Sequence, residues 1–206
     1  MTQSLFDQAG NRKYLIAKER VAFVAAALQE DALIATFCLT LLLTGARISE
    51  VLAVTRARID SRDEAIVFET LKRRRRNLFR AIPAPRQLLD LIEATTRSHP
   101  NAICDRVWPW GRTTAWKHAK RVMKAAGIAD AMCKPKALRH GFAVEAGQRG
   151  VSLNIVQRWL GHARIETTAI YAAALGEEER KLARRTWGSV VSAISCVEPK
   201  QEEKHG

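Results

Sequence analysis

The sequence lacks an apolar segment of the length that a membrane-spanning helix needs. Its best candidate, residues 33–43, is much shorter than the roughly 20 apolar residues that cross a bilayer, so it indicates a buried helix instead. The N-terminal stretch MTQSLFDQAG also lacks the charged and then apolar pattern of a secretory signal. From these two absences we expect a cytoplasmic protein with no membrane partner.

Cysteine is scarce, and its placement excludes the common metal-binding patterns. The sequence has 4 cysteines, and none lies at the short spacing from another that a metal site requires. We therefore expect no metal site, and we expect reduced thiols at Cys38, Cys104, Cys133 and Cys196.

Positive charge is in large excess. Lysine and arginine together number 34 against 21 aspartate and glutamate residues, which gives a formal net charge of +13 at pH 7. A surplus of this size favours a polyanionic partner, with nucleic acid ahead of an anionic membrane surface. With 206 residues, of which 47% are hydrophobic, the chain can form the core of one ordinary domain.

Apolar residues recur at helical spacing along most of the chain, and they predict a mainly α-helical domain. The predicted helices in the first two thirds of the chain cover residues 14–28, 33–43, 48–54, 88–96 and 113–126. The large side chains expected on their buried faces include Val21, Leu28, Leu91 and Trp116.

Residues 57–83 interrupt the helical pattern and predict an antiparallel β-hairpin. Residues 65–70 and 78–82 are short runs with β-branched and aromatic side chains, and the segment LKRRRRN connects them. A run of cations is usually a solvated surface, but cations crowded into a turn repel one another unless a polyanion lies against them. We therefore predict DNA contacts from the tip of the hairpin, made by Arg73, Arg74, Arg75 and Arg76.

A second basic surface lies on the predicted helix 113–126. The cations on the side opposite to its apolar face are Lys117, Lys120, Arg121 and Lys124. This face either follows a DNA backbone or is simply solvated, and both alternatives stay open.

Residues 134–175 carry the densest group of candidate catalytic side chains. Arg139 precedes a run of apolar helical positions, Gly150 ends that helix, and Gly161 ends the next one directly before His162. A third short helix is predicted to carry Tyr171. This arrangement can bring an arginine, a histidine and a tyrosine to one point, although such a trio also occurs by chance in helical proteins.

The motifs LRHGFA, LGH and the two threonines before Tyr171 follow the motif TGARISE at residues 44–50. In this order and at these spacings they resemble the phage integrase family of tyrosine site-specific recombinases, from Leu15 to Trp187. The resemblance implies an integrase-like catalytic domain, mainly α with a small antiparallel β-sheet. Because only residues 1–13 precede Tyr14, the chain looks like the catalytic-domain-only kind, similar to fimbrial switch invertases.

We expect three segments along the chain. Residues 1–13 form an N-terminal arm, residues 14–195 form the catalytic domain, and residues 196–206 form a disordered charged tail. Within the catalytic domain, residues 176–195 either dock onto a neighbouring protomer, as the resemblance implies, or pack on their own domain.

The resemblance implies a role in phosphodiester cleavage for each motif residue. Tyr171 attacks the phosphate and leaves a 3′-phosphotyrosyl enzyme. Arg47 and Arg139 clamp the phosphate, because a guanidinium offers paired donors and stays charged. Lys72 protonates the leaving 5′ hydroxyl, a role that arginine fills poorly. His162 hydrogen-bonds the phosphate or the tyrosine through a ring N–H.

Other residues around these motifs are expected to support the site. Glu50 orients Arg47 or the start of its helix and does not react. The family usually reads His-x-x-Arg, whereas this chain has Lys136 in the histidine position before Arg139. A protonated lysine cannot accept the tyrosine's proton, so Lys136 either acts neutral after desolvation or serves as a third phosphate cation. His140 directly follows Arg139, so on a helix we expect it to point elsewhere and to be structural.

The resemblance implies a DNA-breaking and rejoining enzyme that acts on double-stranded DNA at specific sites, by integration, excision, inversion or resolution. Its partners would be further copies of the chain, four around two sites, and accessory DNA-bending proteins, on a bacterial nucleoid, plasmid or phage DNA. Because the tyrosine ester conserves the bond energy, no cofactor is expected. Two alternatives stay open. One is a type IB topoisomerase-like nickase, and the other is a catalytically impaired DNA-binding regulator, which Lys136 favours.

Overall fold

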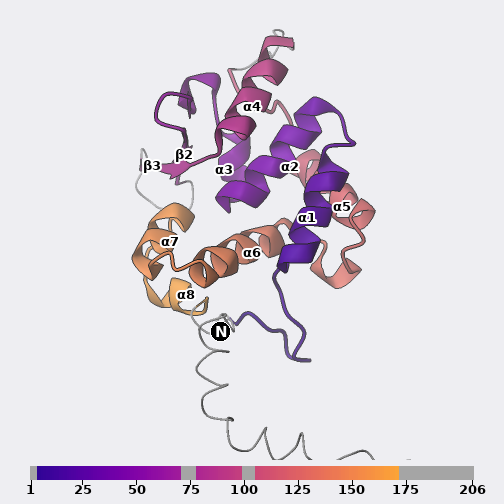
Figure 1. Ribbon diagram of the computed structural model, residues 1–206, viewed down its shortest axis with the longest axis vertical. Helices are drawn as coiled ribbons and strands as arrows, with labels where there is room; N and C mark the ends of the chain where they lie inside the picture. The colour runs from indigo at the N-terminus through magenta and orange to yellow at the C-terminus, as the bar shows by residue number, and fades with distance from the viewer. Residues whose placement is uncertain (1–3, 71–77, 99–104, 172–206) are drawn as a thin grey trace, which may run out of the picture. The chain divides into compact units, whose positions relative to one another are not determined.

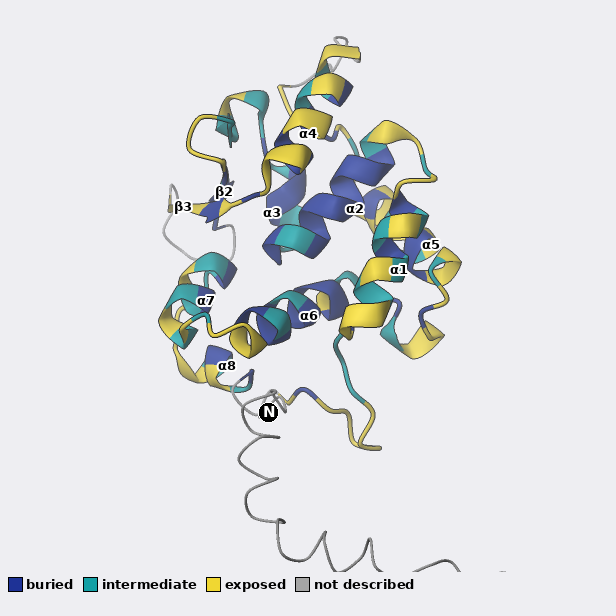
Figure 2. Cartoon of the chain, viewed as in Figure 1, coloured by how far each residue is buried: buried dark blue, intermediate teal, exposed yellow. Residues whose placement is uncertain are grey.

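Helix α2, Ala32–Thr44, is the centre of the fold in the computed structural model. Ten of its 13 residues are buried, and it packs against α1 (Ala17–Ala27), α4 (Arg86–Ser98), α5 (Arg112–Ala125) and α6 (Pro135–Gln148). Figure 2 shows α2 buried along most of its length, whereas α1, α4 and α5 each expose a face. The prediction of a buried apolar helix is confirmed.

Three threonines are buried in α2, and each is satisfied by its own helix. The hydroxyls of Thr36, Thr40 and Thr44 donate hydrogen bonds to carbonyl oxygens four residues earlier, at 2.8, 2.7 and 2.6 Å. Thr36 Oγ1 also accepts a hydrogen bond from Trp108 Nε1 at 3.2 Å. Because these polar groups are satisfied locally, α2 can be surrounded by other elements.

The structure describes residues 4–70, 78–98 and 105–171 (Figure 1), all of which belong to one compact unit, residues 1–174. The predicted hairpin tip, with Lys72 and Arg73–Arg76, lies outside the described residues, and so do residues 172–206 with the predicted docking segment and tail. None of the described helices is long and apolar enough to cross a membrane.

The hairpin is present as part of a three-stranded antiparallel sheet in the order β1 (Ile59–Asp60), β2 (Ala65–Glu69), β3 (Phe79–Pro83). The register of the two longer strands pairs Glu69 with Phe79 and Ala65 with Pro83. The two-residue strand β1 was not predicted, because so short a strand carries no periodic signal. The predicted fold class, mainly α with a small antiparallel sheet, is confirmed.

Two glycines end the helices that lead to the predicted motifs. Gly45 ends α2 with a φ of 61°, and α3 (Ile48–Leu52) begins directly after Arg47. Gly161 ends α7 (Leu153–Leu160) with a φ of 63°, just before His162. Both glycines adopt the left-handed conformation that lets the chain turn sharply after a helix. Arg47 therefore lies two residues beyond the end of α2, at the start of α3, and His162 lies directly beyond the end of α7.

The third predicted helix is shorter than expected. Helix α8 covers only Glu166–Ala169, so Tyr171 lies just beyond its end and is not carried within it. The Tyr171 backbone N–H still donates to Thr168 O at 3.0 Å, which continues the turn of α8. Tyr171 is therefore held by the last turn of a short helix.

The predicted N-terminal arm folds back on the rest of the unit. Leu5 is buried in a cluster that also contains Tyr171, Val156 and Leu160. Phe6 and Arg12 form an antiparallel bridge, which turns residues 4–13 into a short loop. The first described residues therefore pack against the segment that carries the candidate nucleophile.

Four side chains that were predicted to face inward are exposed: Val21, Leu28, Leu91 and Trp116. On α4 Leu89 is buried instead of Leu91, which lies two residues later. On α5 the small Ala115 is buried instead of its neighbour. The exposed indole of Trp116 is covered by the Lys120 ammonium, which lies 5.2 Å from the ring centroid. The helix positions were correct, and most of the predicted inward residues are buried, so the error is confined to positions at the edges of the buried faces.

We expect Gly45→Ala to lower the free energy of unfolding by about 2–4 kcal/mol. A Cβ at this position would lie 2.5 Å from Phe142 Cδ1, and the positive φ would be strained in addition. Gly147→Ala, at an exposed position in the last turn of α6 where a Cβ meets no other atom, is the matched control and should stabilise by about 0.5–1 kcal/mol. Urea denaturation of both variants checks this, and equal effects would contradict it.

Candidate active site

Arg47 is fixed at the start of α3 by Glu50. Its Nη1 donates to Glu50 Oε1 at 2.8 Å, and its backbone N–H donates to Glu50 Oε2 at 2.8 Å. The carboxylate side chain is only 1% exposed, whereas the Arg47 side chain is 29% exposed. One side of the Arg47 guanidinium is therefore held by the buried Glu50 carboxylate, while another part of the side chain reaches solvent. Glu50 does orient Arg47, as the sequence predicted.

Arg80, on β3, is the residue that sequence reasoning missed. Its Nη2 donates to Glu50 Oε2 at 2.7 Å, its Nη1 to Thr70 Oγ1 at 2.9 Å, and its Nε to the Trp159 carbonyl at 2.7 Å. The signal was available, because Arg80 shares the buried face of β3 with Ile82. An arginine on the buried face of a strand needs partners, and here they come from three separate segments.

Glu50 stays ionised because two guanidinium groups surround it. Burial alone would raise the pKa of this carboxyl. The charge and hydrogen bond of Arg80, together with the backbone N–H and charge of Arg47, outweigh burial and hold the pKa of Glu50 below its usual value. The buried negative charge in turn holds both arginines in place.

Arg139 lies on α6 and joins the ends of two other helices. Its Nη1 donates to Gly45 O at 2.8 Å and its Nη2 to Leu160 O at 2.6 Å. These carbonyls lie at the C-terminal ends of α2 and α7, where a helix dipole is negative. Burial, followed by the charge of Arg47, lowers the pKa of Arg139 to about 9, so the group is still a cation at neutral pH.

Tyr171 lies beside these cations in an apolar setting. It is 3% exposed, and its ring stacks on the His162 ring with 6.4 Å between centroids and 11° between planes. Burial raises the pKa of Tyr171 to about 12, against the opposing charges of Arg139 and Arg47. The phenol is therefore un-ionised at neutral pH, although two cations favour its ionised form.

His162 is neutral and is oriented by the turn that follows α7. Its Nδ1 lies 2.9 Å from Thr168 Oγ1, within hydrogen-bonding distance. Burial, followed by the charges of Arg139 and Arg47, lowers its pKa to about 3. The charges of the same two arginines therefore act on both His162 and Tyr171. Arg139 also donates to the Leu160 carbonyl, two residues before His162, and the His162 ring stacks on Tyr171, so these side chains lie in one site.

The expectation that His140 points away from this group is wrong. Its Nδ1 lies 2.9 Å from Tyr171 Oη, although Arg139 next to it points to the helix ends. Consecutive side chains on a helix diverge by about 100°. Arg139 reaches the ends of α2 and α7, and His140 reaches Tyr171. The two side chains therefore diverge but still contact parts of the same site. Lys136, one turn earlier, is exposed at the start of α6.

The predicted basic face of α5 is partly neutralised within the protein. Arg121 forms an ion pair with Glu30 at 2.6 Å, and Lys124 forms one with Asp130 at 3.1 Å. Lys120 lies over Trp116, and Lys117 is exposed. An ion pair on an exposed surface contributes little and is easily exchanged for a phosphate. The basic face of α5 can therefore still bind a polyanion.

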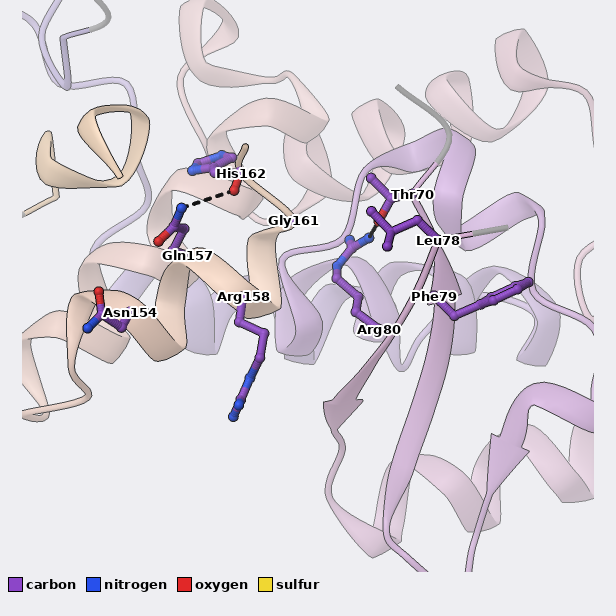
Figure 3. Close-up of a pocket in the computed structure, with 9 residues that line it drawn as sticks. All are labelled: Thr70, Leu78, Phe79, Arg80, Asn154, Gln157, Arg158, Gly161 and His162. Carbon is purple, nitrogen blue, oxygen red and sulfur yellow. Dashed lines mark hydrogen bonds between the residues drawn. The ribbon is translucent and has the colours of Figure 1, made fainter. Parts of the chain in front are cut away.

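A cavity of about 260 Å³ opens between β3 and α7 (Figure 3). It is lined by side chains from both elements and from the turn after α7: Thr70, Leu78, Phe79, Arg80, Asn154, Gln157, Arg158, Gly161 and His162. Gln157 Nε2 donates to the His162 carbonyl at 3.2 Å across its wall. Arg80 and His162 border both this cavity and the group around Tyr171. Two of the residues that line the cavity, Thr70 and Leu78, flank the predicted hairpin tip.

Within the described ranges, no cluster of three histidine, cysteine or acidic side chains could hold a metal ion. The groups that the candidate site offers for chemistry are the guanidinium groups of Arg47 and Arg139 and the phenol of Tyr171. Guanidinium groups can neutralise the non-bridging oxygens of a phosphate, and a phenol oxygen can attack the phosphorus.

Comparison with known proteins identifies the family in which this arrangement occurs. A family model described as the phage integrase family matches residues 13–178. The tyrosine recombinase XerD of Brucella abortus biovar 1 (strain 9-941) is 35% identical over an alignment that covers 69% of this chain and 48% of the relative. The chain therefore spans about half the length of the curated relatives it matches.

Solved structures show the same fold. The XerH site-specific recombinase, in a post-cleavage complex with palindromic difH substrate, has a TM-score of 0.75 and 20% identity, over 90% of this chain and 57% of that chain. The XerA recombinase has a TM-score of 0.70 and 21% identity, over 84% of this chain and 62% of that chain. The predicted integrase-like fold is confirmed.

We expect Arg80→Ala to lower the free energy of unfolding by about 3 kcal/mol, because it removes one partner from a buried ion pair. The control is Arg121→Ala, whose guanidinium is 54% exposed in its pair with Glu30, and which should lose less than about 1 kcal/mol. Urea denaturation measures both, and similar losses would count against a special role for Arg80.

Stability should also fall below pH 6.5. The pKa values of His140 and His162 are lowered to about 4 and about 3, chiefly by burial, and that of His118 is lowered in the same direction. Between pH 6.5 and 4 the unfolded chain therefore binds protons that the folded chain does not. The free energy of unfolding should decrease by up to about 1.4 kcal/mol per pH unit for each imidazole. Denaturation at pH 7.5, 6.5, 5.5 and 4.5 tests this, and a flat profile would contradict it.

Proposed function

This chain belongs to the phage integrase family, and we propose that it cuts and rejoins DNA strands at specific sites through a covalent ester of Tyr171. The observation that carries the proposal is the packing of the Tyr171 ring on His162, directly after the helix end that holds Arg139, where the charges of Arg139 and Arg47 both act on the phenol. A buried phenol next to two guanidinium groups is suited to attack on a phosphate that those groups bind.

The two arginines would bind the scissile phosphate. Arg47 is anchored on one side by Glu50 and is partly exposed on the other, so it can donate to an incoming oxygen. Arg139 uses two of the five N–H donors of a guanidinium on the carbonyls of Gly45 and Leu160. The phosphate would offset the mutual repulsion of the two cations, which stabilises the complex and the negative charge that develops during attack.

The remaining roles follow the family motifs. His162 would donate a hydrogen bond to the phosphate, and Lys72 would protonate the leaving 5′ oxygen. Lys136, exposed beside the site, would serve as a further cation for the DNA backbone. The reaction conserves the energy of the phosphodiester bond in the tyrosine ester, so the proposal includes no nucleotide or metal cofactor.

The partner would be double-stranded DNA, held mainly through its phosphates. The net charge of +13 and the basic surface of α5 support this, together with Arg73–Arg76 at the hairpin tip. We propose that residues 14–195 act as the catalytic domain and that residues 176–195 dock onto a neighbouring copy when several copies assemble on two sites. DNA binding that depends on phosphate contacts is sensitive to salt. Accessory DNA-bending proteins would strengthen this binding.

Tyr171→Phe should abolish the covalent complex. The probe is a nicked duplex that carries the DNA flanking the gene, and the readout is a protein–DNA band that survives denaturant. The variant removes only the attacking oxygen, so DNA binding in a gel-shift assay should persist. The matched control is Tyr14→Phe, because Tyr14 is the only other tyrosine of the chain, and it should form the band normally.

The outcomes separate the proposal from its alternatives. Binding to the duplex without any covalent band in the wild type would indicate a DNA-binding regulator. Relaxation of a supercoiled plasmid without recombinant products would indicate a nickase similar to type IB topoisomerases. A covalent band that persists in Tyr171→Phe would show that the nucleophile is another residue.

A further inference from the structure

We propose that His140 is the catalytic base that accepts the phenol proton of Tyr171. The inference rests on the proposed function, because it assumes that Tyr171 is the nucleophile. Its starting point is a direct contact, since His140 Nδ1 lies 2.9 Å from Tyr171 Oη. A base must lie within hydrogen-bonding distance of the proton that it removes, and this imidazole does so before any DNA is bound.

The surroundings of His140 determine which of its two ring nitrogens carries the proton. The residue is 4% exposed, and its Nε2 is buried without a hydrogen-bond partner among the described residues. If Nδ1 carried the proton, both Nε2 and the phenol hydrogen would lack a partner in this contact. If Nε2 carries it, the phenol donates to the free lone pair of Nδ1, and only Nε2 is left unsatisfied. The second arrangement leaves fewer unsatisfied groups and points the Nδ1 lone pair at the proton to be removed.

Lys136, which occupies the usual histidine position of the family, cannot fill this role as it stands. It is exposed, and its positive charge is felt at His140. A cation has no lone pair with which to accept a proton. His162 is also unsuitable, because its Nδ1 is directed to Thr168 and its ring lies parallel to the phenol ring. In the described part of the chain, His140 is therefore the neutral nitrogen base in contact with Oη.

The charge around His140 favours its neutral form before the reaction. Burial is the main cause of a pKa lowered to about 4, and nearby cations add to it. The titratable and charged groups that act on it or face it are Lys13 of the N-terminal segment, Lys136 and Arg139 of α6, His162 after α7, and Tyr171 after α8. A phosphate bound by the arginines brings a negative charge that opposes these cations. Binding of DNA would therefore raise the proton affinity of His140 at the moment when it is needed.

The step balances without an added reactant. Tyr171 Oη forms a bond to phosphorus as its proton moves to His140 Nδ1. The bond from phosphorus to the 5′ oxygen breaks, and its electron pair leaves with that oxygen, which takes a proton from an ammonium group, proposed to be Lys72. On rejoining, the 5′ hydroxyl attacks the ester and the phenol oxygen recovers its proton from His140.

The test uses variants that separate proton transfer from positioning. In His140→Asn the amide oxygen lies close to the position of Nδ1, so it can accept a hydrogen bond from Oη but cannot take the proton. His140→Ala removes both functions. The control is His118→Asn, which alters another partly buried histidine with a lowered pKa, on α5 and stacked near Trp110. Thermal denaturation and gel shifts establish that each variant folds and binds the duplex.

The substrate is the same duplex of flanking DNA with sulfur in place of the bridging 5′ oxygen. A thiolate leaves without an acid, so the rate of covalent complex formation reports attack by Tyr171 independently of Lys72. At pH 7 and saturating DNA, His140→Asn and His140→Ala should both be slower than the wild type by about 10²–10⁴-fold. Their rates should rise tenfold per pH unit as hydroxide takes over, while the wild-type rate levels off, and His118→Asn should match the wild type.

Each outcome decides between two explanations. If His140→Asn retains the wild-type rate, the histidine only positions the phenol and the inference is wrong. A loss that is equal at every pH would also overturn it, because a missing base is replaced by hydroxide at high pH. If the wild type itself forms no covalent complex while binding the duplex, the proposed function fails and this inference fails with it.

Discussion

A single buried carboxylate, that of Glu50, holds together the parts of the chain on which the site depends. One oxygen accepts from Arg47 Nη1 at 2.8 Å, and the other accepts from Arg80 Nη2 at 2.7 Å. Arg80 extends this connection to the Trp159 carbonyl, next to the end of α7. A charge buried to this extent must be paired, so the position of each guanidinium follows from the position of Glu50. The start of α3, the strand β3 and the end of α7 are thereby fixed relative to one another.

The site also uses the ends of helices as partners for positive charge. Arg139 is held by the carbonyls of Gly45 and Leu160, so its place depends on where α2 and α7 stop. Both helices stop at a glycine in the left-handed conformation, and a Cβ on Gly161 would lie 3.1 Å from the Arg80 guanidinium. The glycines of the two motifs therefore do more than end helices. Gly161 leaves room for the Arg80 guanidinium, and Gly45 leaves room for the Phe142 ring.

The fold and the motif residues were predictable from the sequence because their signals are local. Helix spacing located α2, and the glycines of TGARISE and LGH located the helix ends that carry Arg47 and His162. The contacts of Arg80 were missed because its partners Glu50 and Trp159 lie 30 and 79 positions away along the chain, so no local pattern indicates them. His140 was misjudged for a different reason. Helical geometry gave its direction relative to Arg139, but not which segments would surround α6.

The contact between the first and last described segments has a consequence for how the protein is made. Leu5 and Tyr171 lie in one apolar cluster, although they are 166 positions apart in the sequence and therefore leave the ribosome at different times. That cluster cannot close on a partly translated chain, because the segment with the phenol is still missing. A growing polypeptide can therefore pack α2 against α1 and α4 first and against α5 and α6 later, and the pocket for the nucleophile is completed only after Tyr171 has emerged.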